Sequence, residues 1–179
     1  MYIINDTNLK FAWESDELIE KMMLETSYAS TFVDSKDGLS NKYIFTEDET
    51  PFFEQHIVSV MTDVVDIFQK FILIDFNSFF IDEEKDSEWD VSSNVSGFSS
   101  RDNEFDDTSY NTIRLNIIDE RVREYILKSL LVQWYKTTGD LARFKQSSED
   151  KASAYIGMFC ALKYLKENGA YYKNNVTLS

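Results

Sequence analysis

The sequence predicts a mainly α-helical protein of the α+β class: a helical bundle with a C-terminal helical hairpin and a projecting antiparallel β-ribbon or arm. Apolar residues recur at helical spacing in four stretches, and an acidic stretch rich in serine and asparagine interrupts them. The chain has 179 residues, of which 43% are hydrophobic and 15% aromatic, so it can fill a substantial core. We therefore expect one domain, residues 1–179.

The first helix is predicted over residues 15–29, after a weakly alternating segment, residues 1–13, that suits a short strand or an extended arm. Ser15 is a favourable N-cap, and the acids that follow it place negative charge near the positive end of the helix dipole. Apolar residues at three- and four-residue spacing continue the pattern: Leu18, Ile19, Met22 and Met23. This spacing predicts that one side of the helix faces the core.

The second helix completes the N-terminal helical region, residues 15–71. Thr50 is expected to cap it, and Pro51, the only proline, suits the first turn, where no N–H is needed. The helix is predicted over residues 51–70, and its broad apolar stripe is typical of a central core element. The stripe comprises Phe53, Ile57, Val60, Met61, Val64, Phe68 and Phe71, with Phe52, Val58 and Val65 at its edges.

The middle of the chain, residues 72–117, is predicted to be an antiparallel β-ribbon that carries an acidic arm. Residues 71–81 fit a helix end or a strand, and their β-branched and aromatic content favours the strand. Residues 82–111 hold 10 acids and 2 bases, which is typical of a solvated hairpin or flexible arm. Residues 111–117 alternate as a returning strand. Five acids would project from one strand face: Asp82, Glu84, Asp86, Glu88 and Asp90.

The C-terminal helical hairpin, residues 119–168, is predicted to consist of helices over 119–137 and 141–168. Gly139 is expected to end the first helix in the left-handed conformation, and Asp140 to cap the second. A break near Ser147-Ser148 and a C-terminal tail over 170–179, after Gly169, are also expected. The core face of the first helix comprises Val122, Ile126, Leu127, Leu130, Leu131 and Trp134. That of the second comprises Leu141, Phe144, Ala152, Ile156, Phe159, Leu162 and Leu165.

Charge is divided unevenly along the chain. Residues 1–120 carry 27 Asp and Glu against 8 Lys and Arg, a net of −19, whereas residues 121–179 carry 5 against 10, a net of +5. The acidic part of one copy could therefore pair with the basic part of the next, so we expect self-assembly. The basic candidates lie on the predicted hairpin: Arg121, Arg123, Lys128, Lys136, Arg143 and Lys145. A solvated polar face opposite the core is the alternative explanation for them.

No reaction is indicated, and we expect no catalytic, cofactor or metal site. His56 and Cys160 are the only residues of their kinds, which excludes the usual zinc ligand sets. We expect a buried structural role for Cys160 and a core or boundary position for His56. The acidic run lacks the glycine and final glutamate of a calcium loop. A net charge of −14 disfavours general phosphate-backbone binding. Neither a signal peptide nor a membrane span is predicted, so synthesis in the cytoplasm is expected.

The predicted hairpin shows a further pattern. Its first helix ends in the aromatic pair Trp134-Tyr135, the turn 139–142 reads Gly-Asp-Leu-Ala, and the second helix carries tyrosine and small residues. In this pattern residues 119–167 resemble the helical hairpin of head-to-tail connector proteins (adaptor, ring or stopper proteins) of tailed bacteriophages, particularly crAss-like phages of Bacteroidetes. The resemblance covers under a third of the chain. The acidic segment 82–111 resembles the loops or β-arms that such proteins place on neighbours or in the channel.

The resemblance implies a virion structural protein without an active site. It would form an oligomeric ring, commonly of twelve copies, at the head–tail junction. Its partners would be further copies of itself, the portal protein and tail proteins, and DNA would pass through an acidic lumen without specific binding. The ring stoichiometry, the connector layer and the role of the acidic N-terminal third stay open.

Two other hypotheses belong to different functional classes. A small acidic cytoplasmic inhibitor of the immunity or anti-restriction type would bind a basic partner protein by charge mimicry. This suits the acidic first part of the chain but leaves the division of charge unexplained. An enzyme is disfavoured because no set of site residues is visible. Salt distinguishes the inhibitor from the connector ring, since a charge-steered inhibitor loses association rate steeply as ionic strength rises.

Overall fold

The structure is a computed structural model that describes residues 2–4, 9–31, 44–71, 80–82, 95–99 and 112–175. Within these ranges the α-helices are α1 (Ser15–Thr31), α2 (Thr50–Phe68), α3 (Thr112–Thr138) and α4 (Leu141–Asn175). A 3-10 turn, η3 (Glu47–Glu49), precedes α2. The strands are β1 (Tyr2–Ile4), β2 (Leu9–Glu14), β3 (Phe80–Asp82) and β4 (Val95–Ser99). The prediction of a mainly α-helical class is confirmed.

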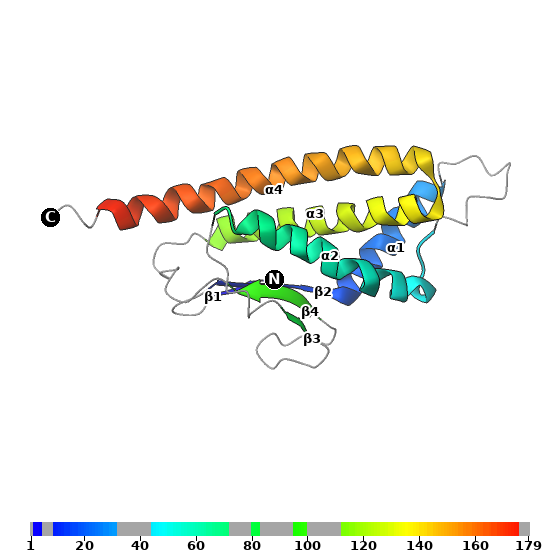
Figure 1. The fold of residues 1–179 in the computed structure, drawn as a ribbon, viewed down its shortest axis with the longest axis horizontal. Coiled ribbons are helices and arrows are strands. Elements are labelled where there is room, and N and C mark those ends of the chain that lie inside the picture. The colour runs from blue at the N-terminus through cyan, green and yellow to red at the C-terminus, as the bar shows by residue number, and fades with distance from the viewer. Residues whose placement is uncertain are drawn as a thin grey trace.

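The helices and the sheet form layers (Figure 1). Helix α3 lies in the middle and packs against α1, α2 and α4. The strands pair antiparallel in the order β1-β2-β4-β3, on the side of the helices opposite α4 (Figure 1). Phe11 and Trp13 of β2 are buried, and the Phe11 ring meets that of Phe68 edge to face at 5.4 Å. The sheet and the helices therefore share one hydrophobic core.

Helix α1 is joined to the segment before α2 by a buried threonine. The Thr26 hydroxyl donates to the Met22 carbonyl at 2.8 Å and accepts from the Phe45 N–H at 3.0 Å. The Phe45 ring packs edge to face on Trp134 of α3 at 5.2 Å. One hydroxyl thus satisfies a backbone donor that has no access to water. Leu18 and Met22 of α1 are buried, as predicted.

Helix α2 begins at Thr50, one residue before the predicted start, and a 3-10 turn precedes it. The Thr46 N–H donates to Glu49 Oε2 at 2.8 Å, and the Thr50 hydroxyl donates to the Glu47 carbonyl at 2.7 Å. Thr50 lies inside the helix rather than capping it, because the 3-10 turn adds a capping pair upstream. Pro51 occupies the first turn, as predicted. The expected core residues within α2 are buried and Phe71, just after it, is partly buried, whereas Val58 at the stripe's edge is 43% exposed.

The prediction of a returning strand over residues 111–117 is wrong, because α3 begins at Thr112. Alternation and helical spacing overlap in this segment, and packing decides between them. Leu115, Ile118 and Val122 lie on one face of the helix and are buried, while Ile117 is 46% exposed. Strand β3 pairs with β4 instead, within the sheet rather than in a separate ribbon. Residues 80–82 are a strand, as favoured; residues 72–79 lie outside the described residues.

Helix α4 is longer and more continuous than predicted. It runs through the serine pair, where the Ser148 hydroxyl donates back to the Phe144 carbonyl at 2.7 Å. It also runs through Gly169 to Asn175, so the predicted tail over 170–179 is wrong as far as Asn175. A glycine inside a helix costs only about 1 kcal/mol relative to alanine and does not end the helix by itself.

The turn between α3 and α4 matches the prediction. Gly139 has φ +81°, which a residue with a Cβ rarely adopts, so glycine suits this C′ position. Asp140 Oδ1 accepts from the Arg143 N–H at 3.0 Å and so caps α4. Trp134, just before the turn, is buried, as predicted for a core residue, and so is Tyr135 beside it.

The core face predicted for α4 is partly wrong. Leu162 is buried and Phe144 is partly buried, as expected, but Leu141 is 79% and Ile156 is 61% exposed. The helix instead presents Ala154, Met158 and Leu162 to the core. Both sides of α4 carry apolar residues, so periodicity alone does not show which side α3 covers.

Candidate partner-contact surfaces

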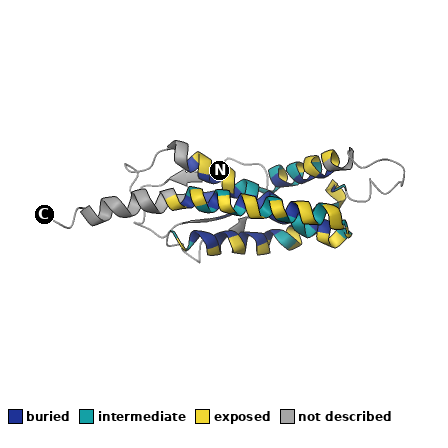
Figure 2. Cartoon of the chain, turned by 90° about the horizontal axis from the view of Figure 1, so that it is seen from above, coloured by how far each residue is buried: buried dark blue, intermediate teal, exposed yellow. Residues whose placement is uncertain are grey.

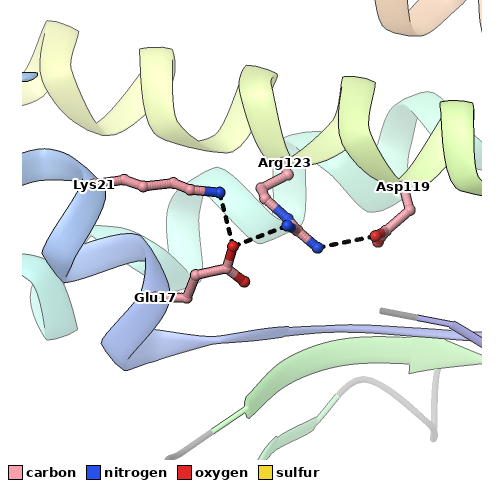
Figure 3. Close-up of polar contacts among 4 residues, drawn as sticks. All are labelled: Glu17, Lys21, Asp119 and Arg123. Atoms are coloured by element: carbon pink, nitrogen blue, oxygen red, sulfur yellow. Dashed lines mark hydrogen bonds and ion pairs between the residues drawn. The ribbon is translucent and has the colours of Figure 1, made fainter.

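Arg123 of α3, a predicted partner contact, faces helix α1 of its own chain (Figure 3). Arg123 Nη1 donates to Glu17 Oε1 at 2.8 Å, and Arg123 Nη2 donates to Asp119 Oδ2 at 3.0 Å. Lys21 Nζ donates to the same Glu17 oxygen at 2.7 Å. Two acids and two bases therefore form one network that joins α1 to α3.

The surroundings of Glu17 favour its charged form. Burial raises the pKa of Glu17, but the hydrogen bond from Lys21 and the charge of Arg123 outweigh it, so that this pKa lies below its ordinary value. The Asp119 side chain is only 11% exposed and the Arg123 side chain 25%. Removing one partner of a pair with such low exposure leaves the other charge poorly solvated, which costs more than breaking a surface pair. Arg123 thus links α3 to α1 within one chain.

Two more ion pairs connect the acidic N-terminal helices to the basic C-terminal helices. Lys128 Nζ of α3 lies 3.2 Å from Glu25 Oε2 of α1. Lys151 Nζ of α4 lies 3.9 Å from Asp63 Oδ2 of α2. Part of the charge division seen in the sequence is therefore neutralised within one copy. Lys128, like Arg123, has an acidic partner before any second copy approaches.

Arg143 supports the turn between α3 and α4. Its Nε lies 3.3 Å from Asp140 Oδ2, and its guanidinium carbon lies 5.9 Å from the centre of the Tyr135 ring. The pKa of Tyr135 is raised to about 12, mainly by burial; the charge of Arg143 opposes this rise and the charge of Asp140 adds to it. The Arg143 side chain is only 12% exposed, so its contacts are mainly within the chain.

The remaining basic candidates are more accessible. Arg121 Nη1 pairs with Glu124 Oε2 at 2.9 Å on the surface of α3, and its side chain is 51% exposed. Lys136 and Lys145 are exposed on either side of the α3–α4 turn. Among the described residues, neither of these two lysines forms a salt bridge. They are the part of the predicted basic surface that can best receive an acidic partner.

The acidic candidates lie mostly beyond the described ranges. Asp82 ends β3, where its backbone is opposite Val95 of β4. The other four, Glu84, Asp86, Glu88 and Asp90, lie outside the described residues. Contact between these acids and the basic residues of a second copy stays a prediction.

The histidine and the cysteine occupy different environments. The His56 ring is half-buried with its centre 4.3 Å from that of Phe52, in keeping with a boundary position. Cys160 is exposed, so the prediction that it is buried is wrong. It lies on the outer side of α4, whereas Met158 and Leu162 face the core. Over the described part of the chain, no three His, Cys, Asp or Glu side chains gather as metal ligands would.

Sequence reasoning missed the acidic partners of these bases. The pairs Glu17–Lys21 and Asp119–Arg123 are four residues apart on their helices, a spacing that predicts contact. The bond between Glu17 and Arg123 crosses from one helix to another, and no local spacing indicates it. Only the packing of α1 on α3 brings these two side chains together.

Comparison of the chain with protein-family models, with curated proteins and with solved structures gives no match in any of the three. None of the helices, over the residues that the structure describes, is long and apolar enough to cross a membrane. Function therefore has to be inferred from the chain's own residues and from the pattern at its α3–α4 turn.

Proposed function

We propose that the protein is a virion structural protein, a subunit of an oligomeric ring at the head–tail junction of a tailed phage. The observation that carries the proposal is the pair of long helices α3 and α4, which lie side by side and are joined at Gly139-Asp140 (Figure 1). In the proposal, this pair corresponds to the helical hairpin of the connector-like pattern. In the proposal, the acidic segment 82–111 is a projecting arm that contacts a neighbouring copy.

The proposed mechanism is assembly rather than catalysis. The exposed Lys136 and Lys145 would attract the acidic arm of the next copy, and burial of apolar surface would hold the contact. Such a contact is heterologous and closes into a ring when the rotation per subunit is right. With a net charge of −14, the ring could present an acidic lumen through which DNA passes without binding.

Mass and shape test this proposal. Light scattering at low and moderate salt should give a high-mass species, and negative-stain images should show closed rings. Replacing both Lys136 and Lys145 with glutamate should lower the yield of rings, because it places like charges at the contact. The control is Lys70→Glu, a change at an exposed lysine after α2. Absence of rings both alone and on purified portal protein would contradict the proposal.

The acidic exterior supports a second candidate, an inhibitor that binds a basic protein. Asp16 and Glu20 of α1 and Glu54 and Asp66 of α2 are exposed. A negatively charged surface of this kind can compete for a cationic site. This candidate requires a monomer or dimer that binds a single cationic partner, with an association rate that falls steeply as salt rises. Salt-resistant rings would exclude it.

A further inference from the structure

The outer side of α4 is not covered by the other residues that the structure describes. Helix α4 packs mainly on α3, and Figure 2 looks down on its other side, where exposed residues recur along the helix. Exposed residues at helical spacing form what we call the outer stripe: Lys145, Glu149, Ala152, Ile156, Cys160 and Lys163. It contains residues that the periodicity predicted to be in the core.

The centre of the outer stripe suits contact with another helix. Ile156 is a branched apolar residue that is 61% exposed. Ala152 and Cys160 lie one turn before and one turn after it, and both are small and exposed. Small side chains on either side of an apolar one let two helix axes approach closely, with the larger side chain filling the space between them.

The outer stripe of one copy is complementary in charge to the outer stripe of a second copy that runs antiparallel to it. Glu149 lies seven residues before Ile156, and Lys163 lies seven residues after it. We propose that a second copy of this chain docks here, with the two α4 helices antiparallel and crossing at Ile156. Glu149 of each copy then faces Lys163 of the other, and Ala152 faces Cys160. Because the contact is isologous, each pairing occurs twice.

Lys163 already interacts within its own chain, but an ammonium group has three donors and can serve a second acceptor. The stripe from Lys145 to Lys163 extends over roughly 27 Å of helix at 1.5 Å per residue. A single helix pair of this length buries less area than a standard stable interface, so the dimer is expected to be weak. The inference goes beyond the proposed connector function, because it needs neither a ring nor a portal.

Disulfide trapping tests the register. Ala152→Cys creates a thiol opposite the native Cys160 of the second copy, so mild oxidation should give a covalent dimer on a non-reducing gel. Within one chain these positions are two turns apart, too far for a disulfide. Ala152→Cys combined with Cys160→Ala should lose the crosslink, since residue 152 does not face itself. Ser59→Cys, at an exposed position of α2, measures crosslinking by random collision.

Charge exchange tests the pairing independently. In sedimentation velocity over a concentration series, Glu149→Lys should raise the dimer Kd by roughly threefold to tenfold, since two weak surface ion pairs become repulsive. Lys163→Glu should do the same. The double variant, which exchanges the two charges, should return Kd to within about twofold of the original. Ile156→Asp should abolish the dimer, because it places two carboxylates at the crossing point.

Several results would overturn the inference. One is equal crosslinking of Ala152→Cys and the Ser59→Cys control. Another is stronger crosslinking of the double variant Ala152→Cys with Cys160→Ala than of Ala152→Cys alone, which would indicate a parallel pair. A third is a monomer throughout the concentration series together with no trapped dimer. Helical circular dichroism of every variant shows whether it is folded. The α4 crosslink reports only the contact between two α4 helices, so its result does not depend on whether the protein also forms rings.

Discussion

Replacing Arg123 with methionine tests whether the ion network between α1 and α3 stabilises the fold. Methionine keeps much of the apolar stem of the arginine but removes the guanidinium. Asp119 and Glu17 then each lose a charge-assisted hydrogen bond, of 3.0 Å and 2.8 Å respectively. Glu17 keeps its bond to Lys21. The change therefore removes the link between the two helices while leaving the pair within α1 in place.

The exposure of the side chains sets the expected magnitude. Breaking a fully buried pair costs about 3–5 kcal/mol, whereas an exposed pair is worth about 0–1 kcal/mol. The side chains here are 25% exposed for Arg123, 35% for Glu17 and 11% for Asp119, which places the network between these limits. We expect a loss of about 1.5–2.5 kcal/mol. For a domain of this size this lowers Tm by roughly 3–10 °C.

Urea unfolding at a fixed protein concentration, followed by circular dichroism, measures this loss. Arg121→Met is the matched control, because Arg121 lies on the same helix with a side chain that is 51% exposed, and should cost less than about 0.5 kcal/mol. A double-mutant cycle with Glu17→Gln should give a coupling energy of about 0.5–1.5 kcal/mol. Equal losses for Arg123→Met and Arg121→Met would refute the reasoning.

Acid provides a second check on the same network. The pKa of Glu17 is lowered from its ordinary value of 4.5, so its ion pairs stabilise the folded state fully above that value. This contribution is lost as pH falls through the lower pKa of the folded state. The difference between the native chain and Arg123→Met should therefore be largest near neutral pH and should shrink below about pH 4. A difference that grows in acid would contradict the assignment.

Three more changes have defined outcomes. Thr26→Val removes the buried acceptor of the Phe45 N–H and should cost about 1–3 kcal/mol; the exposed Thr62→Val should cost less than about 0.5 kcal/mol by the same urea assay. Gly139→Ala should cost about 1 kcal/mol through its φ of +81° alone, since the added methyl meets nothing within 4 Å. Tyrosine absorbance should show a component that ionises near pH 12 and disappears in Tyr135→Phe. Because the pKa of Tyr135 is raised in the folded state, its contribution to stability should be lost as pH rises between about 10 and 12.

The sequence predicts the helices well where a single periodicity is present. In α2, Pro51 indicates the start, and valines at helical spacing leave no alternative, so both the helix and its core face follow from the residues. In α3 the segment 112–118 supports two periods at once. There the burial of Leu115 and Ile118 by the rest of the fold decides, and local propensity does not.

The contact surfaces were harder to predict than the helices. Helix α4 carries apolar residues on both sides, so its sequence does not show which side faces α3. The structure shows that Met158 is inside and Ile156 outside. Likewise, the sequence shows the basic residues of α3, but it does not show that Arg123 contacts an acid 106 residues away in the chain. Both facts depend on how two helices pack, which is a property of the fold.

Charge division along a sequence therefore does not by itself indicate assembly between copies. An acid and a base held close within one chain meet at an effective concentration in the millimolar range or above, which free copies rarely match. Glu17 and Arg123 are paired in this way. If copies of this chain pair through charge, exposed groups such as Lys136 and Lys145 are the ones that remain accessible for it. Because exposed ion pairs contribute little, assembly between copies would have to draw on apolar surface as well, and in the proposed α4 pair the exposed Ile156 would supply part of it.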